Sequence, residues 1–196
     1  MLTLSTTPAH KALAMIEFSS IAAGVTALDA ITKTAEVDIL AAQTICPGKY
    51  MIIFCGGISE VNASLEATRK SPTLIDEFLL GRPHPDIFAA LNSKAGVYQI
   101  ADSPQTSALG LLETYSGAAA IKAADTAAKT SWVTLAEIHI AHGMCGKSTV
   151  LITGDIAAVA AALDAASNEA ISKSQLLDTA LIPNPDKKMI KAMGLG

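Results

Sequence analysis

Aromatic residues are scarce in this chain. They make up 4% of its 196 residues, although 51% of the residues are hydrophobic. The apolar content is therefore mostly Ala, Ile, Leu and Val, and these short side chains suit closely packed helices lying on a sheet. They are poor material for a large aromatic-lined ligand pocket.

Charged residues are also few, at 16% of the chain, whereas a typical soluble domain carries about 25%. We therefore expect part of the surface to be covered by other subunits. The formal net charge is −4, which argues against nucleic acid as a partner because nucleic-acid binding requires a basic face.

Long apolar runs are absent despite a positive mean hydropathy. The run Tyr50–Cys55 is among the longest, and a membrane-spanning helix needs about 20 such residues. The first residues lack the basic and apolar regions of a signal peptide. The three cysteines form no CxxC pattern and no disulfide framework. The sequence predicts a soluble protein that is not exported and keeps its thiols reduced.

The chain contains an internal duplication. The segment Ala12–Glu17 aligns with Ala108–Glu113 at a shift of 96 residues, and after a two-residue insertion the alignment continues at a shift of 98. The matched pairs are Asp29/Asp125, Lys33/Lys129, Val37/Val133, Gly48/Gly146, Gly56/Gly154 and Val61/Val159. Such ordered matches predict two copies of one small domain. We place the first domain at 11–92, a linker at 93–107 and the second domain at 108–190.

Each copy has the pattern strand, helix, strand, strand, helix, strand, which predicts an α/β (α+β) fold with a mainly antiparallel sheet. The expected strands are 13–17, 37–41, 50–55 and 73–80, then 109–113, 133–141, 149–153 and 175–182. Residues Ile21, Val25, Leu28 and Ile31 have helical spacing, and Ser19 or Ser20 is the candidate N-cap. Ser59 and Asp155 are candidate caps of the second helices, and a proline-containing turn ends each copy.

This order of elements resembles the bacterial microcompartment (BMC) shell domain, a four-stranded sheet flanked by helices. The resemblance also extends to motifs: Asp-x-x-x-Lys on the first helix of each copy, Gly56-Gly57 and Gly154-Asp155, and Arg82-Pro83-His84. The tips Thr44–Lys49 and Gly143–Lys147 are similar to those of tandem-domain trimers of the propanediol-utilisation shell type. The second copy departs from the pattern, with Asn184 and Asp186 where Arg and His are typical.

The resemblance implies a structural shell protein and not an enzyme. It implies a homotrimer with pseudo-sixfold symmetry that tiles with hexameric shell proteins, in a microcompartment in the bacterial cytoplasm. The expected edge contacts are Lys33, Lys129 and Arg82, and a solvated surface charge is the alternative for each. A central pore is then expected, lined by Thr44, Ile45, Pro47, Gly48, Gly143, Met144 and Gly146.

Cys46 is the candidate cofactor ligand. One cysteine cannot hold a metal cluster, but a threefold axis brings three copies to one point, and thiolates are the usual ligands of iron–sulfur clusters. The resemblance implies a [4Fe–4S] cluster at Cys46, with the fourth iron left to water or an exogenous ligand. The cluster would serve electron transfer or gating, with encapsulated redox enzymes as possible partners. The alternative is a plain pore-lining thiol in a pore that passes small metabolites.

Cys145 lies one position out of register, because Met144 aligns with Cys46 when the returning strands are matched. It is a candidate second ligand, a redox-sensitive constriction, or simply a small loop residue. Cys55 is expected in the core.

Other motifs are weaker. The stretch from Ala141 to Ser148 is one residue short of a phosphate-binding loop, but a strand pattern follows it where such a loop requires a helix. His139 and His142 lack further ligands at metal spacing, although His142 is a candidate for the pore mouth. A freestanding enzyme or ligand-binding homodimer is the remaining hypothesis, and no catalytic set supports it.

Overall fold

The computed structural model describes residues 11–92, 107–140, 143–172 and 174–193. Its internal contacts divide the chain into two units, Met1–Pro83 and His84–Gly196. Within the described residues, the first unit contains β1 (Ala12–Phe18), α1 (Ile21–Thr34), β2 (Asp38–Ile45), β3 (Lys49–Gly56), α2 (Ile58–Thr68) and β4 (Leu74–Leu80).

The second unit repeats this order after one additional helix. It contains α3 (Pro85–Asn92), β5 (Ala108–Thr114), α4 (Gly117–Thr130), β6 (Val133–Ile140), β7 (Ser148–Gly154), α5 (Ile156–Ser172), β8 (Leu176–Pro183) and α6 (Lys187–Ala192). The α/β prediction of two similar domains is confirmed.

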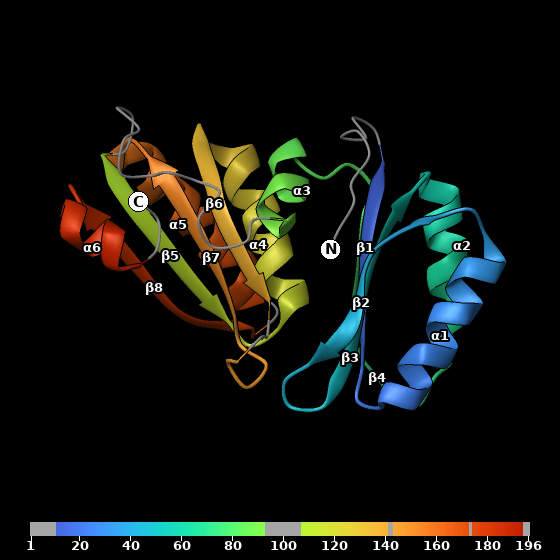
Figure 1. Ribbon diagram of the computed structural model, residues 1–196. Coiled ribbons are helices and arrows are strands. Elements are labelled where there is room, and N and C mark those ends of the chain that lie inside the picture. Colours follow the sequence, from blue (N-terminus) through green and yellow to red (C-terminus); the bar gives the residue numbers. More distant parts are fainter. Residues whose placement is uncertain (1–10, 93–106, 141–142, 173, 194–196) are drawn as a thin grey trace. The chain divides into compact units, whose positions relative to one another are not determined.

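Each unit is built on one four-stranded antiparallel sheet. The strand orders are β2-β3-β1-β4 and β6-β7-β5-β8, so equivalent strands occupy equivalent places. Figure 1 shows α1 and α2 together on one face of the first sheet, and α4 and α5 on one face of the second. In the second unit, α6 packs on the opposite face, where Ile190 contacts Leu109 and Leu151.

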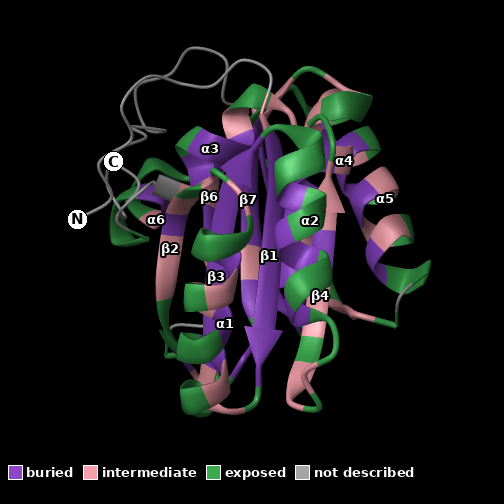
Figure 2. Ribbon diagram, turned by 90° about the vertical axis from the view of Figure 1, so that its right-hand side faces the viewer, coloured by how far each residue is buried: buried purple, intermediate pink, exposed green. Residues whose placement is uncertain are grey.

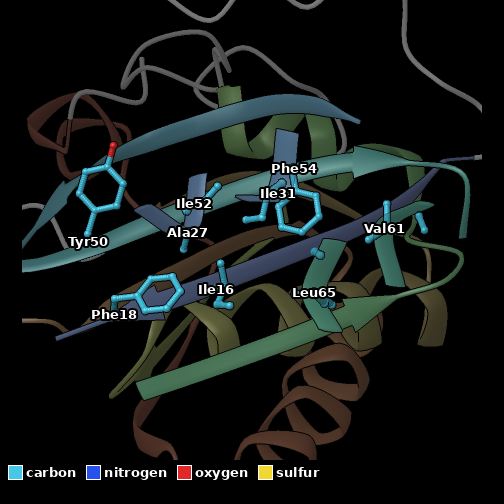
Figure 3. Packing of buried hydrophobic residues seen from close by; sticks show 11 residues of the cluster. Ile16, Phe18, Ala27, Ile31, Tyr50, Ile52, Phe54, Val61 and Leu65 are labelled. Carbon is cyan, nitrogen blue, oxygen red and sulfur yellow. The ribbon is translucent and has the colours of Figure 1, made fainter. Parts of the chain in front are cut away.

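The core of the first unit lies between its sheet and its two helices. Alternate residues of β1, including Ile16 and Phe18, meet Ile31 of α1 and Leu65 of α2 in one buried cluster, which Figure 3 shows at close range. This arrangement follows from the period-two alternation of a strand, which points every second side chain towards the helices.

The start of α1 follows the sequence prediction, but its buried face is narrower than predicted. Ser20 is the N-cap, and its hydroxyl oxygen accepts a hydrogen bond from the Ala23 backbone N–H. Ile31 is buried, whereas Ile21 and Val25 are 44% and 51% exposed. The helical spacing correctly identified a helix, but it overestimated how many of the apolar positions face the core of the chain.

The cap of α2 differs from the prediction, whereas Asp155 lies at the predicted place before α5. Gly57 is the N-cap of α2 and supplies no side-chain hydrogen bond. Because α2 already begins at Ile58, Ser59 lies inside the first turn and cannot cap the helix. Asp155 directly precedes α5, and its backbone carbonyl accepts the Val159 N–H at 2.8 Å.

Two short helices, α3 and α6, occur where only proline-containing turns were predicted. Pro85 stands at the first position of α3, where a proline is tolerated because that N–H has no helical partner. Our predicted first domain extended to residue 92, whereas α3 packs against α4 and β6 of the second unit. Residues 93–106 of the predicted linker lie outside the described residues.

Gly24 is required by a close contact in the first unit. A Cβ at this position would lie 2.5–2.7 Å from the Cβ, Cγ and Cδ1 atoms of Tyr50. At the equivalent positions the second unit has Ala120 and Ser148, which are both fully buried. The first copy thus has the small residue on the helix and the large one on the strand, whereas the second copy has a larger helix residue and a smaller strand residue.

We expect Gly24→Ala to lower the free energy of unfolding by about 1–2 kcal/mol. Overpacking costs about 1–3 kcal/mol, and the better helix propensity of Ala returns up to about 1 kcal/mol. Urea unfolding at a fixed protein concentration measures the change. In a Tyr50→Gly background, which also removes the Tyr50 Cβ, the clash is gone, so Gly24→Ala should stabilise the protein. Equal effects in the two backgrounds would contradict this interpretation of the contact.

Candidate functional site: the two hairpin tips

The tip between β2 and β3 is a tight turn. The backbone N–H of Gly48 donates to the Ile45 carbonyl oxygen at 3.0 Å, so Cys46 and Pro47 are the two central residues, and the peptide bond between them is cis. Gly48 has a φ of +81°, a left-handed conformation that favours glycine.

The tip between β6 and β7 is longer by two residues. Thr44 pairs with Tyr50 in the first hairpin and Ile140 pairs with Ser148 in the second, so five residues separate the first pair in the sequence and seven separate the second. The predicted two-residue insertion therefore lies in the tip itself. Residues 141–142, including His142, are outside the described residues.

Cys46 and Cys145 occupy the same position within their turns. In the second tip the Lys147 N–H donates to the Met144 carbonyl oxygen at 3.1 Å, so Cys145 is the first central residue, as Cys46 is in the first tip. Counting from the returning strands places Met144 opposite Cys46, because the second turn is displaced by one residue. The two cysteines therefore share a turn position that the sequence alignment does not indicate, although their backbones differ: Cys145 has a φ of +53°, and Cys46 precedes a cis proline.

The three cysteines have different environments, and all are free thiols. Cys145 is exposed, Cys46 is partly exposed and Cys55 is buried. Burial raises the pKa of the Cys55 thiol above its ordinary value, because it disfavours the thiolate. Cys55 therefore belongs to the core as predicted, and the two tip cysteines are the accessible thiols.

Thiol alkylation should follow this order of exposure. In metal-free protein under native conditions we expect Cys145 to react fastest, Cys46 more slowly and Cys55 only after denaturation, since the thiolate is the reacting species and must be accessible. Mass spectrometry of digested protein over time measures each site. Modification of Cys55 at a rate similar to Cys145 would be inconsistent with its buried position.

An ion pair lies beneath the first tip. Lys49, the first residue of β3, donates from Nζ to the Glu17 Oε2 atom at 3.3 Å, and the side chain of Glu17 is only 1% exposed. A buried carboxylate of this kind requires a cationic or hydrogen-bonding partner. The pair connects the base of the tip to the central strand β1. The sequence analysis identified Glu17 only as a repeated residue and did not predict its partner.

The structure places the predicted pore residues at the two tips, one tip in each unit. Thr44, Pro47, Gly48 and Gly143 are exposed, and Met144 is partly exposed. Ile45 and Gly146 are buried within the chain, so the side chain of Ile45 does not present itself to solvent. The reason is its place in the last rung of the ladder, where it pairs with Lys49.

One chain does not assemble a metal site by itself in the part that the structure describes. No group of three or more His, Cys, Asp or Glu side chains is close enough to hold a metal ion there. His139 lies 3.7 Å from Glu137, between Nδ1 and Oε1. The strand β7 directly follows the tip near Cys145, so the resemblance to a phosphate-binding loop is not supported.

The predicted edge lysines form equivalent ion pairs on the first helix of each copy. Lys33 contacts Asp29 at 2.6 Å and Lys129 contacts Asp125 at 2.5 Å, both from Nζ to Oδ2. Such pairs at i, i+4 contribute only about 0.3–0.5 kcal/mol when exposed. Arg82 is exposed.

Among the described helices, none is both long and apolar enough to cross a membrane.

Comparison with known proteins agrees with this architecture. The BMC domain model matches residues 12–83 and 108–185. The chain is 37% identical over 186 residues to the bacterial microcompartment shell protein PduT of Citrobacter freundii, covering 93% of this chain and 97% of that protein. It is 25% identical over 187 residues to the carboxysome assembly protein CcmO of Synechocystis, covering 90% and 62%.

Solved structures give the same result. A crystal structure of a microcompartments protein from Desulfitobacterium hafniense DCB superposes with a TM-score of 0.81 at 38% identity, covering 93% of this chain and 99% of that one. A fused permuted hexameric shell protein from the RMM microcompartment has the same fold, with a TM-score of 0.61 at 19% identity and coverages of 87% and 89%. The chain therefore belongs to the BMC domain family of microcompartment shell proteins and contains two copies of that domain.

Proposed function

We propose that three copies of this chain close into a ring of six similar domains, which forms a tile of a microcompartment shell around a central pore. The observation that carries the proposal is a difference in burial between the two repeats. Val25 on α1 is 51% exposed, and its counterpart Ile121 on α4 is fully buried. The same holds for Asp29, whose side chain is 62% exposed, and Asp125, whose side chain is 8% exposed.

The opposite difference occurs on the sheet faces turned away from the paired helices. Met15 and Glu17 of β1 are at most 1% exposed, whereas their counterparts Leu111 and Glu113 of β5 are only half-buried. In a ring of equivalent domains, each of these two kinds of surface would be covered by a neighbouring domain. Two such surfaces on one chain favour a heterologous, closed ring.

The exposed side of α1 supports this interpretation. Figure 2 shows exposed and intermediate residues along α1, and Ile21 and Val25 are its large apolar side chains there. Burying one such side chain contributes about 1.5–3 kcal/mol. An apolar helix surface of this kind is expected to be covered in the assembled protein.

The same ring would bring three Cys46 thiols together at the pore. The described residues of one chain supply no complete ligand set, and a partly exposed free thiol at a turn tip suits a site shared between chains. We propose that Cys46 holds a [4Fe–4S] cluster through three chains. Such a cluster supplies one-electron transfer, which fits exchange of electrons with encapsulated redox enzymes. The second candidate function is passage of small metabolites without a cluster, and the exposed Thr44 and Gly48 favour it.

The proposed ring also implies contacts with other shell proteins outside the trimer. Lys33, Lys129 and Arg82 are the proposed contacts to neighbouring shell hexamers, with the tile located in a shell in the bacterial cytoplasm. The proposal assigns the chain no catalytic residue. Cys145 lies in the second set of tips, where it could narrow the opening.

Light scattering and anaerobic iron analysis test the proposal. The purified chain should have the mass of three 20.1 kDa chains, with iron and sulfide in equal amounts after reconstitution. A monomer at all concentrations would refute the tile. A trimer that never retains iron would leave the metabolite pore as the function.

A further inference from the structure

A buried carboxylate holds the start of α3 in the second unit. The backbone N–H of His84 donates to Asp125 Oδ1 at 2.6 Å, and the other oxygen of Asp125 accepts from Lys129 Nζ at 2.5 Å. The side chain of Asp125 is only 8% exposed. Because a hydrogen bond to a charged acceptor is stronger than one between neutral groups, this contact fixes where α3 begins.

The rest of α3 packs by apolar contact. Ile87, Phe88 and Ala90 are at most 4% exposed, and α3 contacts both α4 and β6. His84 also caps the helix, because its Nδ1 accepts the Asp86 backbone N–H at 3.3 Å. The segment 84–92 is thus a small docking element held by Asp125.

The second repeat ends with an element of the same design. Asn184-Pro185-Asp186 corresponds to Arg82-Pro83-His84, and α6 follows as α3 does. Asp186 caps α6 as His84 caps α3, since its Oδ1 accepts the Lys188 backbone N–H at 2.7 Å. The apolar residues Met189, Ile190 and Ala192 take the places of Ile87, Phe88 and Ala90. Asp186 is exposed.

The first repeat contains the matching acceptor without its donor. Asp29 accepts from Lys33 Nζ at 2.6 Å through Oδ2, as Asp125 does from Lys129. Its side chain is 62% exposed, and no donor to its Oδ1 occurs among the described residues. Within the described part of the chain, the first repeat therefore has the carboxylate and the lysine but no counterpart of the docked segment 84–92.

We propose that the turn 184–186, which precedes α6, docks on α1 of a second copy, where Asp29 accepts the backbone N–H of Asp186, while Ile190 keeps its contacts in its own unit. The contact reproduces between chains what His84 and Asp125 form within the second unit. It rests on the proposed ring and names the residues that close it. Val25 lies one helical turn before Asp29 and would stand beside this contact, and its counterpart Ile121 is fully buried.

Paired cysteines test the contact directly. In a Cys46→Ser/Cys145→Ser background, mild oxidation of the Asp29→Cys/Asp186→Cys protein should give covalent dimers and trimers on a denaturing gel. The matched pair His84→Cys/Asp125→Cys should close within one chain and leave a monomer band, because the two residues already meet through the hydrogen bond from the His84 N–H to Asp125 Oδ1. Each single cysteine variant should give no ladder.

A second measurement covers the case in which the paired variant disturbs the ring. Asp29→Ala in the otherwise unchanged chain should weaken trimer association by at least about tenfold, because loss of a charged hydrogen bond costs about 1.5–3 kcal/mol. Dilution followed by light scattering measures it. Asp164→Ala, an exposed aspartate of α5, is the control and should change nothing.

The outcomes separate this inference from the proposed function. Interchain ladders together with weakened association of Asp29→Ala support the contact. A trimer with neither effect, while the His84/Asp125 pair closes normally, overturns the contact and leaves the ring intact. An unmodified chain that is monomeric at all concentrations removes both.

Discussion

Cys46→Ser protein purified without oxygen should contain no iron and show no visible absorption band. In the proposed trimer this single substitution removes three thiolate ligands at once, and serine hydroxyls do not replace them at neutral pH. The expected change is from one cluster per trimer to none. Iron and sulfide analysis after reconstitution measures it, and electron paramagnetic resonance of the reduced protein identifies the cluster type.

Cys145→Ser is the matched control for Cys46→Ser. Both cysteines are the first central residue of a hairpin turn, so either substitution changes one loop side chain and leaves the sheets untouched. We expect the Cys145→Ser trimer to retain its iron, and both variants to remain trimeric. Equal iron loss in the two variants would indicate that both sets of tip cysteines are needed to retain the cluster, and iron retained by Cys46→Ser would contradict the assignment.

The sequence carried most of the information about the fold, because duplication leaves two independent copies of each pattern. Apolar strands such as β1 and β5 and the N-cap Ser20 follow from local rules of alternation and capping. The tip cysteines were also predictable as a pair. Their equivalent turn positions were not predictable. The two-residue insertion lies inside the tip, and an alignment of the two copies does not determine where in the tip it belongs.

What the sequence could not predict depends on contacts between distant segments. The helical spacing of Ile21 and Val25 predicted a buried face, since spacing identifies an apolar stripe but not what covers it. The helix α3 was not predicted because Pro83 precedes it and Pro85 begins it, and such prolines are typical of a turn. Its anchor, Asp125, is 41 residues from His84 and no local signal connects the two.

Val25→Glu should convert the trimer to a folded monomer. Val25 is 51% exposed in the chain, so the substitution leaves the core of the first unit intact. In the proposed ring the same side chain is buried, and the change loses about 1.5 kcal/mol or more of apolar burial and adds the cost of burying an unpaired carboxylate. Three such interfaces are affected. We expect association to weaken by at least about 100-fold, measured by light scattering over a dilution series.

Ala63→Glu on α2 is the control for this prediction. Ala63 is exposed, and its repeat counterpart Ala161 on α5 is exposed as well, so neither copy indicates a covered surface there. This variant should remain trimeric with an unchanged circular dichroism spectrum. If Val25→Glu also remained trimeric and folded, no neighbouring chain would cover α1. The difference in burial between α1 and α4 would then need another explanation. The contact between Asp29 and Asp186 would then lose its basis too, because both residues act through that surface.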